Sequence, residues 1–244
     1  MAMRQEQEAR PVEIFSPNQL ILPETVLPQE VEEVLRRSEK VGLGLFEPYR
    51  LSDTILNQSN IRETLDYKPK SHYWHLIRDG AISGDSPKLP NAWVLIDKTQ
   101  KPDYKNGRQM YEGDPLGLLL SKLRSEGKIQ KVKELSDASR FGIIHDELIQ
   151  IVLPEIAKIL GLDSSQVRLP KVIEFNVIGN LKHQEWGKTN TTEVFADKFG
   201  HLNQLVGGNF DRGGLSDVVS STYGFFNLRS GRIGFRPMIV LFSW

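Results

Sequence analysis

The chain contains 244 residues, in which 31 lysines and arginines balance 31 aspartates and glutamates, and it contains no cysteine. This length is enough to bury a core in one large domain or two small ones. The balanced charge argues against a broad surface for nucleic acid or an anionic membrane. Without cysteine there can be no disulfide, no thiolate nucleophile and no cysteine-bound zinc.

The first residues, MAMRQEQEARPVEIF, lack the apolar core of a secretory signal. No stretch approaches the roughly 20 apolar residues that a membrane-spanning helix requires. We therefore expect a product that is made in the cytoplasm without a signal peptide, has no nucleic-acid partner and does not insert into membranes.

The first third of the chain predicts one helix and one strand. Residues 1–28 are polar and then punctuated by prolines, which is typical of extended lead-in segments. Apolar residues recur at helical spacing over Gln29–Lys40, so we expect an amphipathic helix there. Ala92–Asp97 contains the aliphatic run AWVLI, which predicts a buried strand.

Two helices are expected in the middle of the chain. Leu116–Leu123 supplies the apolar face of the first. The second begins near His145 and carries an apolar stripe at helical spacing. Pro154 should kink this helix, because proline lacks the backbone N–H, and Gly161 is placed to end it.

Strands are expected to dominate the rest. Val172–Ile178 is rich in β-branched residues and alternates, so it predicts a strand. Ile233–Phe242 predicts a second apolar strand, broken by Pro237. The whole pattern predicts an α+β domain.

The segment Asn209–Pro237 uses a restricted alphabet. Every residue in it can be encoded by a codon whose first two bases are randomised while the third stays a pyrimidine. Such codons never encode Lys, Glu, Gln, Met or Trp. Gln204 cannot arise this way and is expected to be framework. Chance would also explain a loop segment that lacks long charged residues.

The last quarter of the chain contains a set of short glycine-rich and aromatic stretches: Glu185-Trp186, Thr191-Thr192-Glu193, Gly207-Gly208, Gly213-Gly214-Leu215-Ser216-Asp217 and Gly234-Phe235-Arg236-Pro237. In these stretches it resembles the variable region of proteins diversified by retroelements, built on the C-type lectin fold of the formylglycine-generating-enzyme type. The resemblance implies small antiparallel sheets with flanking helices and long irregular loops.

The resemblance also implies a domain organisation and a function. Residues 1–70 would be an N-terminal extension packed on a C-type lectin domain at 71–244, with the variable region at about 185–244. In such families a reverse transcriptase copies a template RNA and errs at adenines, so selected codons vary while the fold stays fixed. We expect a ligand-binding protein that recognises an unknown protein or glycan on a cell surface, displayed on a virion or a cell.

Part of this region is expected to be scaffold. Trp186 and Phe235 are large aromatics beside small glycines, which favours core positions. A partly buried Arg236 would anchor the end of the loop to the last strand. A charged hydrogen-bond cluster is expected from Asp211, Arg212 and Asp217.

The candidate binding residues mix aromatic, hydroxyl and guanidinium groups without an apolar period. Antibody loops use the same chemistry, since Tyr and Phe give contact area and Arg gives anchoring. The alternative is that Phe225 and Phe226 are core residues of a loop that folds back. The primary candidates are Val219, Ser220, Ser221, Tyr223, Phe225, Phe226, Leu228, Ser230 and Arg232. The secondary candidates are Asn190, Phe199, His201, Asn203 and Asn209.

No enzymatic activity, metal or cofactor is expected. Sulfatase-modifying relatives of this fold depend on cysteine, which the chain lacks. His145, Asp146 and Glu147 are consecutive and would fan around a helix rather than converge. The sugar-specificity tripeptides of calcium lectins, such as EPN, QPD and WND, are absent. A fixed lectin-like carbohydrate-binding domain and a structural virion protein remain as alternatives.

Overall fold

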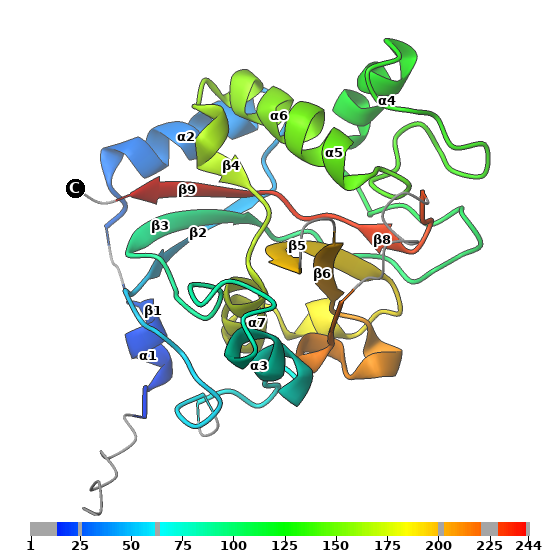
Figure 1. Cartoon of the computed structure of the whole chain (residues 1–244). Helices are drawn as coiled ribbons and strands as arrows, with labels where there is room; N and C mark the ends of the chain where they lie inside the picture. Colours follow the sequence, from blue (N-terminus) through cyan, green and yellow to red (C-terminus); the bar gives the residue numbers. More distant parts are fainter. Residues whose placement is uncertain (1–13, 24–25, 62–63, 200–202, 221–228, 243–244) are drawn as a thin grey trace, which may run out of the picture.

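The computed structural model describes most of the chain, and its core lies around one central sheet (Figure 1). Among the described residues, no helix combines the length and apolar character needed to cross a membrane. The described residues are 14–23, 26–61, 64–199, 203–220 and 229–242.

The larger sheet has five strands in the order β1-β2-β3-β9-β4, and all neighbours are antiparallel. Strands from both sides of the predicted boundary at residue 70 belong to this sheet. β3 confirms the predicted buried strand, since each of its residues is buried. Its strands are β1 (Ile21–Leu22), β2 (Phe46–Leu51), β3 (Ala92–Asp97), β4 (Val167–Arg168) and β9 (Met238–Phe242).

The smaller sheet has four strands in the order β7-β6-β5-β8. Its β5 and β8 are parallel, whereas the other pairs are antiparallel. β8 leads into β9 of the larger sheet through a short connection, so the end of the chain ties the two sheets together. Pro237 lies in this connection, and the predicted break there is confirmed. The strands are β5 (Thr192–Phe199), β6 (Asn203–Gly207), β7 (Val218–Ser220) and β8 (Ile233–Gly234).

The predicted helices of the first two thirds are confirmed. α2 (Gln29–Lys40) has the expected bounds, and α4 (Gly117–Ser125) covers the second prediction. The third is a continuous run of α5 (His145–Glu147), a π-helical turn η1 (Leu148–Val152) and α6 (Leu153–Leu160). The π turn stands before Pro154, where the backbone must adjust to the missing N–H. Gly161 ends α6 with a left-handed φ of 63°.

The predicted strand over Val172–Ile178 is wrong, because this segment forms helix α7 (Val172–Leu181). Its first nine residues are all buried, so no polar face reveals the helical period. Asn176 and Asn180, two buried amides four residues apart, lie on the same face of α7. Both donate to the carbonyl of Tyr67, at 2.7 and 2.9 Å. The spacing of four residues fits a helix, but the common partner that reveals it is known only from the structure.

The shorter helices connect these elements. They are α1 (Pro17–Leu20), α3 (Ser71–Arg78) and the 3₁₀ turns η2 (Ser164–Gln166), η3 (Gln184–Gly187), η4 (Phe210–Arg212) and η5 (Gly214–Ser216).

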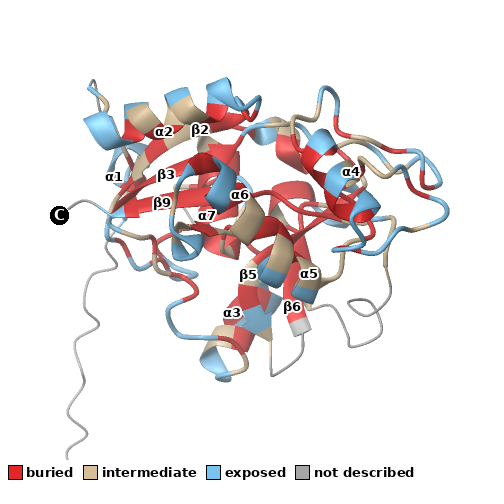
Figure 2. Ribbon diagram, turned by 90° about the horizontal axis from the view of Figure 1, so that it is seen from above, coloured by how far each residue is buried: buried red, intermediate tan, exposed pale blue. Residues whose placement is uncertain are grey.

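Hydrophobic clusters cover both faces of the larger sheet. Along β3, Val94 and Ile96 face a cluster with α3 and α7, while Trp93 and Leu95 face one with α2, α4 and α6. Figure 2 shows β3 and β9 mostly buried between these layers. The chain therefore has the α+β class with predominantly antiparallel pairing that the sequence predicts.

Candidate functional site

Residues 221–228 connect β7 to the segment that leads into β8, and they lie outside the described residues. The structure describes both flanks of this segment, and these flanks determine where it leaves and rejoins the fold. The predicted site residues that fall outside the described ranges are His201, Ser221, Tyr223, Phe225, Phe226 and Leu228.

The N-terminal flank is strand β7, which pairs with β6 so that Ser220 lies opposite Leu205. Val219 is half-buried and packs against the cluster of α2, α4 and α6. Gly207 permits this close pairing, because a Cβ there would collide with the carbonyl of Asp217. Val219 therefore contributes to packing, and Ser220 is the last described residue before the segment.

The C-terminal flank is held by Arg229. Its guanidinium donates to both carboxylate oxygens of Glu147, at 2.6 and 2.8 Å. It also donates to the carbonyl of Gly142 at 3.1 Å and to Oε1 of Gln130 at 2.8 Å. The Arg229 and Glu147 side chains are only 17% and 12% exposed. This bidentate pair fixes the exit of the segment onto α5.

The charge of Glu147 depends on this contact. Burial alone would raise the pKa of the Glu147 carboxyl, but hydrogen bonds from Arg229 and from the backbone N–H of Gln130 outweigh it and lower the pKa. The sequence offered no sign of this role. In the sequence Arg229 stands between the candidate binding residues Leu228 and Ser230 without being one of them, and its partner is 82 positions away.

The next residues bring one cation to the surface. The amide of Gln109 donates to the carbonyl of Gly231, and the hydroxyl of Ser230 accepts from the backbone N–H of Arg232 at 3.1 Å. Arg232 is exposed, and its guanidinium stacks over the ring of Tyr104 at 4.0 Å. Arg232 is a predicted site residue, and Tyr104 holds it in place. Nothing in the sequence position of Tyr104 indicates this role.

Asn190 and Asn209 lie beside this pair, and both make hydrogen bonds within the fold. Oδ1 of Asn190 accepts from the backbone N–H of Tyr104 at 2.8 Å, and its own N–H donates to Asp103 at 2.9 Å. The amide of Asn209 donates to the carbonyl of Asn190. These two asparagines join the Tyr104 loop to the turn at η4.

The remaining secondary candidates lie on the β5–β6 hairpin. Phe199 is half-buried against the cluster of α3 and α7, at the end of β5. Asn203 begins β6 and pairs with Phe199 in the ladder. Gln204, expected to be framework, is buried, and its side-chain amide contacts Nε2 of His145 at 2.8 Å.

A buried ion pair supports both sheets beneath this surface. Arg236 donates to Glu193 at 2.9 and 3.1 Å, and the hydroxyl of Tyr111 donates to the same carboxylate at 3.0 Å. The guanidinium also lies 3.8 Å from the ring centre of Trp186. All four side chains are buried. Arg236 was predicted to be partly buried and to anchor the loop to the last strand. It is fully buried instead, and it ties the segment before β9 to Glu193 of β5 and to the carbonyl of Asp97 in β3.

The predicted charged cluster is confirmed in part. Arg212 donates to Oδ2 of Asp217 at 3.0 and 3.2 Å, and the backbone N–H of Asn209 donates to the same oxygen at 3.2 Å. Burial raises the pKa of Asp217, although Arg212 pulls it down. Asp211 is exposed and takes no part in this pairing.

No group of three or more metal-ligating side chains converges within the described ranges. Of the consecutive residues at the start of α5, Glu147 is engaged by Arg229, His145 contacts Gln204 and Asp146 is exposed.

No protein-family model, curated protein or solved structure matches this chain. Its function is therefore argued from the residues and their geometry.

Proposed function

We propose that the protein is a target-recognition module of C-type lectin type, whose surface around 219–232 is diversified by a retroelement. The observation that carries the proposal is the contrast between this segment and its flanks. Residues 221–228 follow no apolar period, whereas the fold on each side is held by strand pairing or by an ion pair. Fixed ends let a short segment change sequence at little cost to the core.

The chemistry of the segment favours binding. Tyr and Phe offer large rigid contact areas, and Arg offers charged hydrogen bonds, which is the composition of binding hot spots. Arg232 is already exposed and preoriented on Tyr104, so less side-chain entropy is lost when it meets a partner. The restricted alphabet of Asn209–Pro237 supports diversification of this part of the chain.

The proposal predicts that the candidate side chains are dispensable for folding. Replacing Tyr223, Phe226 and Arg232 together with alanine should change Tm by no more than about 4 °C, since the one described contact, that of Arg232 on Tyr104, is worth about 1 kcal/mol. Circular dichroism would measure it. Phe235→Ala is the control, because truncating this fully buried ring should cost about 3–5 kcal/mol.

A fall in Tm of the triple variant that approaches the fall of Phe235→Ala would place these side chains in the core. The segment would then serve the fold, and the proposal would fail. In that case a fixed lectin-like domain, or a structural role, would describe the protein better.

A further inference from the structure

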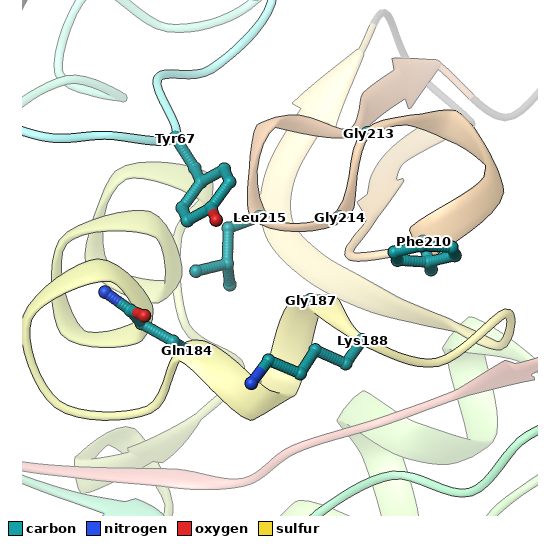
Figure 3. Close-up of a pocket in the computed structure, with 8 residues that line it drawn as sticks. All are labelled: Tyr67, Gln184, Gly187, Lys188, Phe210, Gly213, Gly214 and Leu215. Atoms are coloured by element: carbon teal, nitrogen blue, oxygen red, sulfur yellow. The ribbon is translucent and has the colours of Figure 1, made fainter.

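A hollow of about 380 Å³ lies beside the candidate surface, and none of the predicted site residues lines it (Figure 3). This volume lies within the range of small-molecule sites, about 300–1,000 Å³. It is lined by Tyr67, Gln184, Gly187, Lys188, Phe210, Gly213, Gly214 and Leu215.

Glycines keep the floor of the hollow open. A Cβ on Gly214 would lie 2.6 Å from the carbonyl oxygen of Gly187, and a Cβ on Gly187 would lie 2.7 Å from the backbone nitrogen of Leu215. Gly214 also has a left-handed φ of 59°. η3 and η5 therefore touch through bare backbone, and no side chain from these glycines fills the space above them.

Two aromatic rings stand at the rim. Tyr67 is 46% exposed and Phe210 is 62% exposed, although rings of this size are usually buried. Both are held by their backbones: Tyr67 through Asn176 and Asn180, and Phe210 through its N–H to the carbonyl of Thr189 at 2.8 Å. Exposed and fixed rings are suited to stacking on a ligand.

Besides the hydroxyl of Tyr67, the polar side-chain groups that line the hollow are a cation and an amide. Lys188 pairs with no carboxylate in the described part of the chain, and the nearby Glu185 is held by His183 at 2.9 Å. Nε2 of Gln184 donates to the carbonyl of Asn180 at 3.3 Å, and Oε1 remains as an acceptor. In Figure 3, Gln184 begins the turn η3, and Lys188 directly follows it.

We infer that this hollow binds a single acidic sugar unit, a pyranose bearing a carboxylate. The C–H groups of a pyranose face stack on the negative face of an aromatic ring, a side-chain amide meets its hydroxyls, and Lys188 meets the carboxylate. A purely apolar ligand in the hollow would bury the ammonium group of Lys188 without a partner, and burying an unpaired charge costs free energy. A phosphate would favour a bidentate arginine over one lysine.

This inference deepens the proposed recognition function and rests on it, because the hollow continues the same surface. Phe210 directly follows Asn209, which is bonded to Asn190, and Asn190 is bonded to the Tyr104 loop that holds Arg232. A glycan target would therefore place its acidic terminal sugar in the hollow while the neighbouring Asn190 and Arg232 contact the rest.

The test is an NMR titration of the full chain with sodium glucuronate, with glucose as the neutral sugar control and N-acetylphenylalaninamide as an uncharged mimic of an aromatic peptide side chain. The backbone amides of Gly187, Gly213 and Gly214 report from the floor. Glucuronate should produce saturable shifts and bind more tightly than glucose. Phe210→Ala should weaken binding about three- to tenfold and Lys188→Gln about threefold. The matched control Lys182→Gln, an exposed lysine outside the hollow, should not change it.

Absence of saturable shifts with glucuronate, equal binding of glucose, or tighter binding of N-acetylphenylalaninamide would overturn the inference. The failure of the proposed function is a separate result. The triple alanine variant at residues 223, 226 and 232 should bind glucuronate like the native chain, because the lining residues that the structure describes do not include them. A hollow that does not bind sugar would therefore leave the proposed display role of residues 219–232 untouched. Conversely, loss of fold in the triple variant would refute the display role without affecting the pocket titration of the native protein.

Discussion

Replacing Arg229 should loosen the exit of the 221–228 segment and destabilise the fold measurably. Arg229→Gln removes the bidentate pair with Glu147 and the bonds to Gly142 and Gln130. Breaking a fully buried pair costs about 3–5 kcal/mol, while an exposed pair is worth about 0–1. At 17% and 12% exposure we expect about 2–3 kcal/mol. For a chain of this length this corresponds to a fall in Tm of about 4–12 °C.

Two assays separate this effect from a general loss of charge. Thermal unfolding gives the change in Tm, and hydrogen exchange at the amide of Gly142 reports the clamp locally, because that N–H donates to the carbonyl of Ser230 at 3.0 Å. Arg232→Gln is the matched control, an exposed arginine three positions away. If Arg229→Gln shifts Tm no more than this control and leaves the amide of Gly142 protected, the Arg229–Glu147 ion pair does not hold the segment.

The same pair gives a pH dependence with a definite sign. The Glu147 carboxyl has a lower pKa in the folded state than in the unfolded chain, where it is about 4.3. Its contribution to stability is therefore present above that value and is lost as the pH falls through the folded pKa. The difference in unfolding free energy between the native chain and Arg229→Gln should shrink below about pH 4.

Two further predictions concern the buried charges. Arg236→Met leaves Glu193 buried without its cation and should cost about 3–5 kcal/mol by urea unfolding, while the double variant with Glu193→Leu should recover much of the loss; no recovery would contradict the reasoning. Burial lowers the pKa of Lys101 to about 8, against the pull of Glu193. Because the unfolded pKa is about 10.4, the native chain should gain stability over Lys101→Met as pH rises from about 8 to 10. A constant difference would refute this.

Much of the fold could be predicted from amphipathic spacing. α2 shows one apolar face to the core and one polar face to solvent, and its bounds follow from that contrast. α7 lies at the centre of the molecule, where packing on every side removes the contrast, so its β-branched residues indicated a strand. The buried asparagines of α7 reveal the helix only when their common partner, Tyr67, is known.

The candidate site could be predicted only in part, because composition does not show which residues of a segment are exposed. Unusual composition singled out the segment, but it could not separate residues that contact solvent from those that hold the segment in place. Arg229 and Arg232 look alike in sequence, yet the first is bound to Glu147 and the second is exposed on Tyr104. The hollow at Phe210 was missed because its glycines and its two rings come from three separate parts of the chain.

The most direct test of diversification is to sequence the DNA flanking the coding gene. We predict a near-copy of the segment encoding Glu185–Trp244, differing from it at adenines, beside a reverse transcriptase gene. The differing positions should fall within 219–232 and spare the codons of the buried Glu193 and Arg236. A complete flanking sequence with no such copy would contradict diversification and leave a fixed binding domain as the better description.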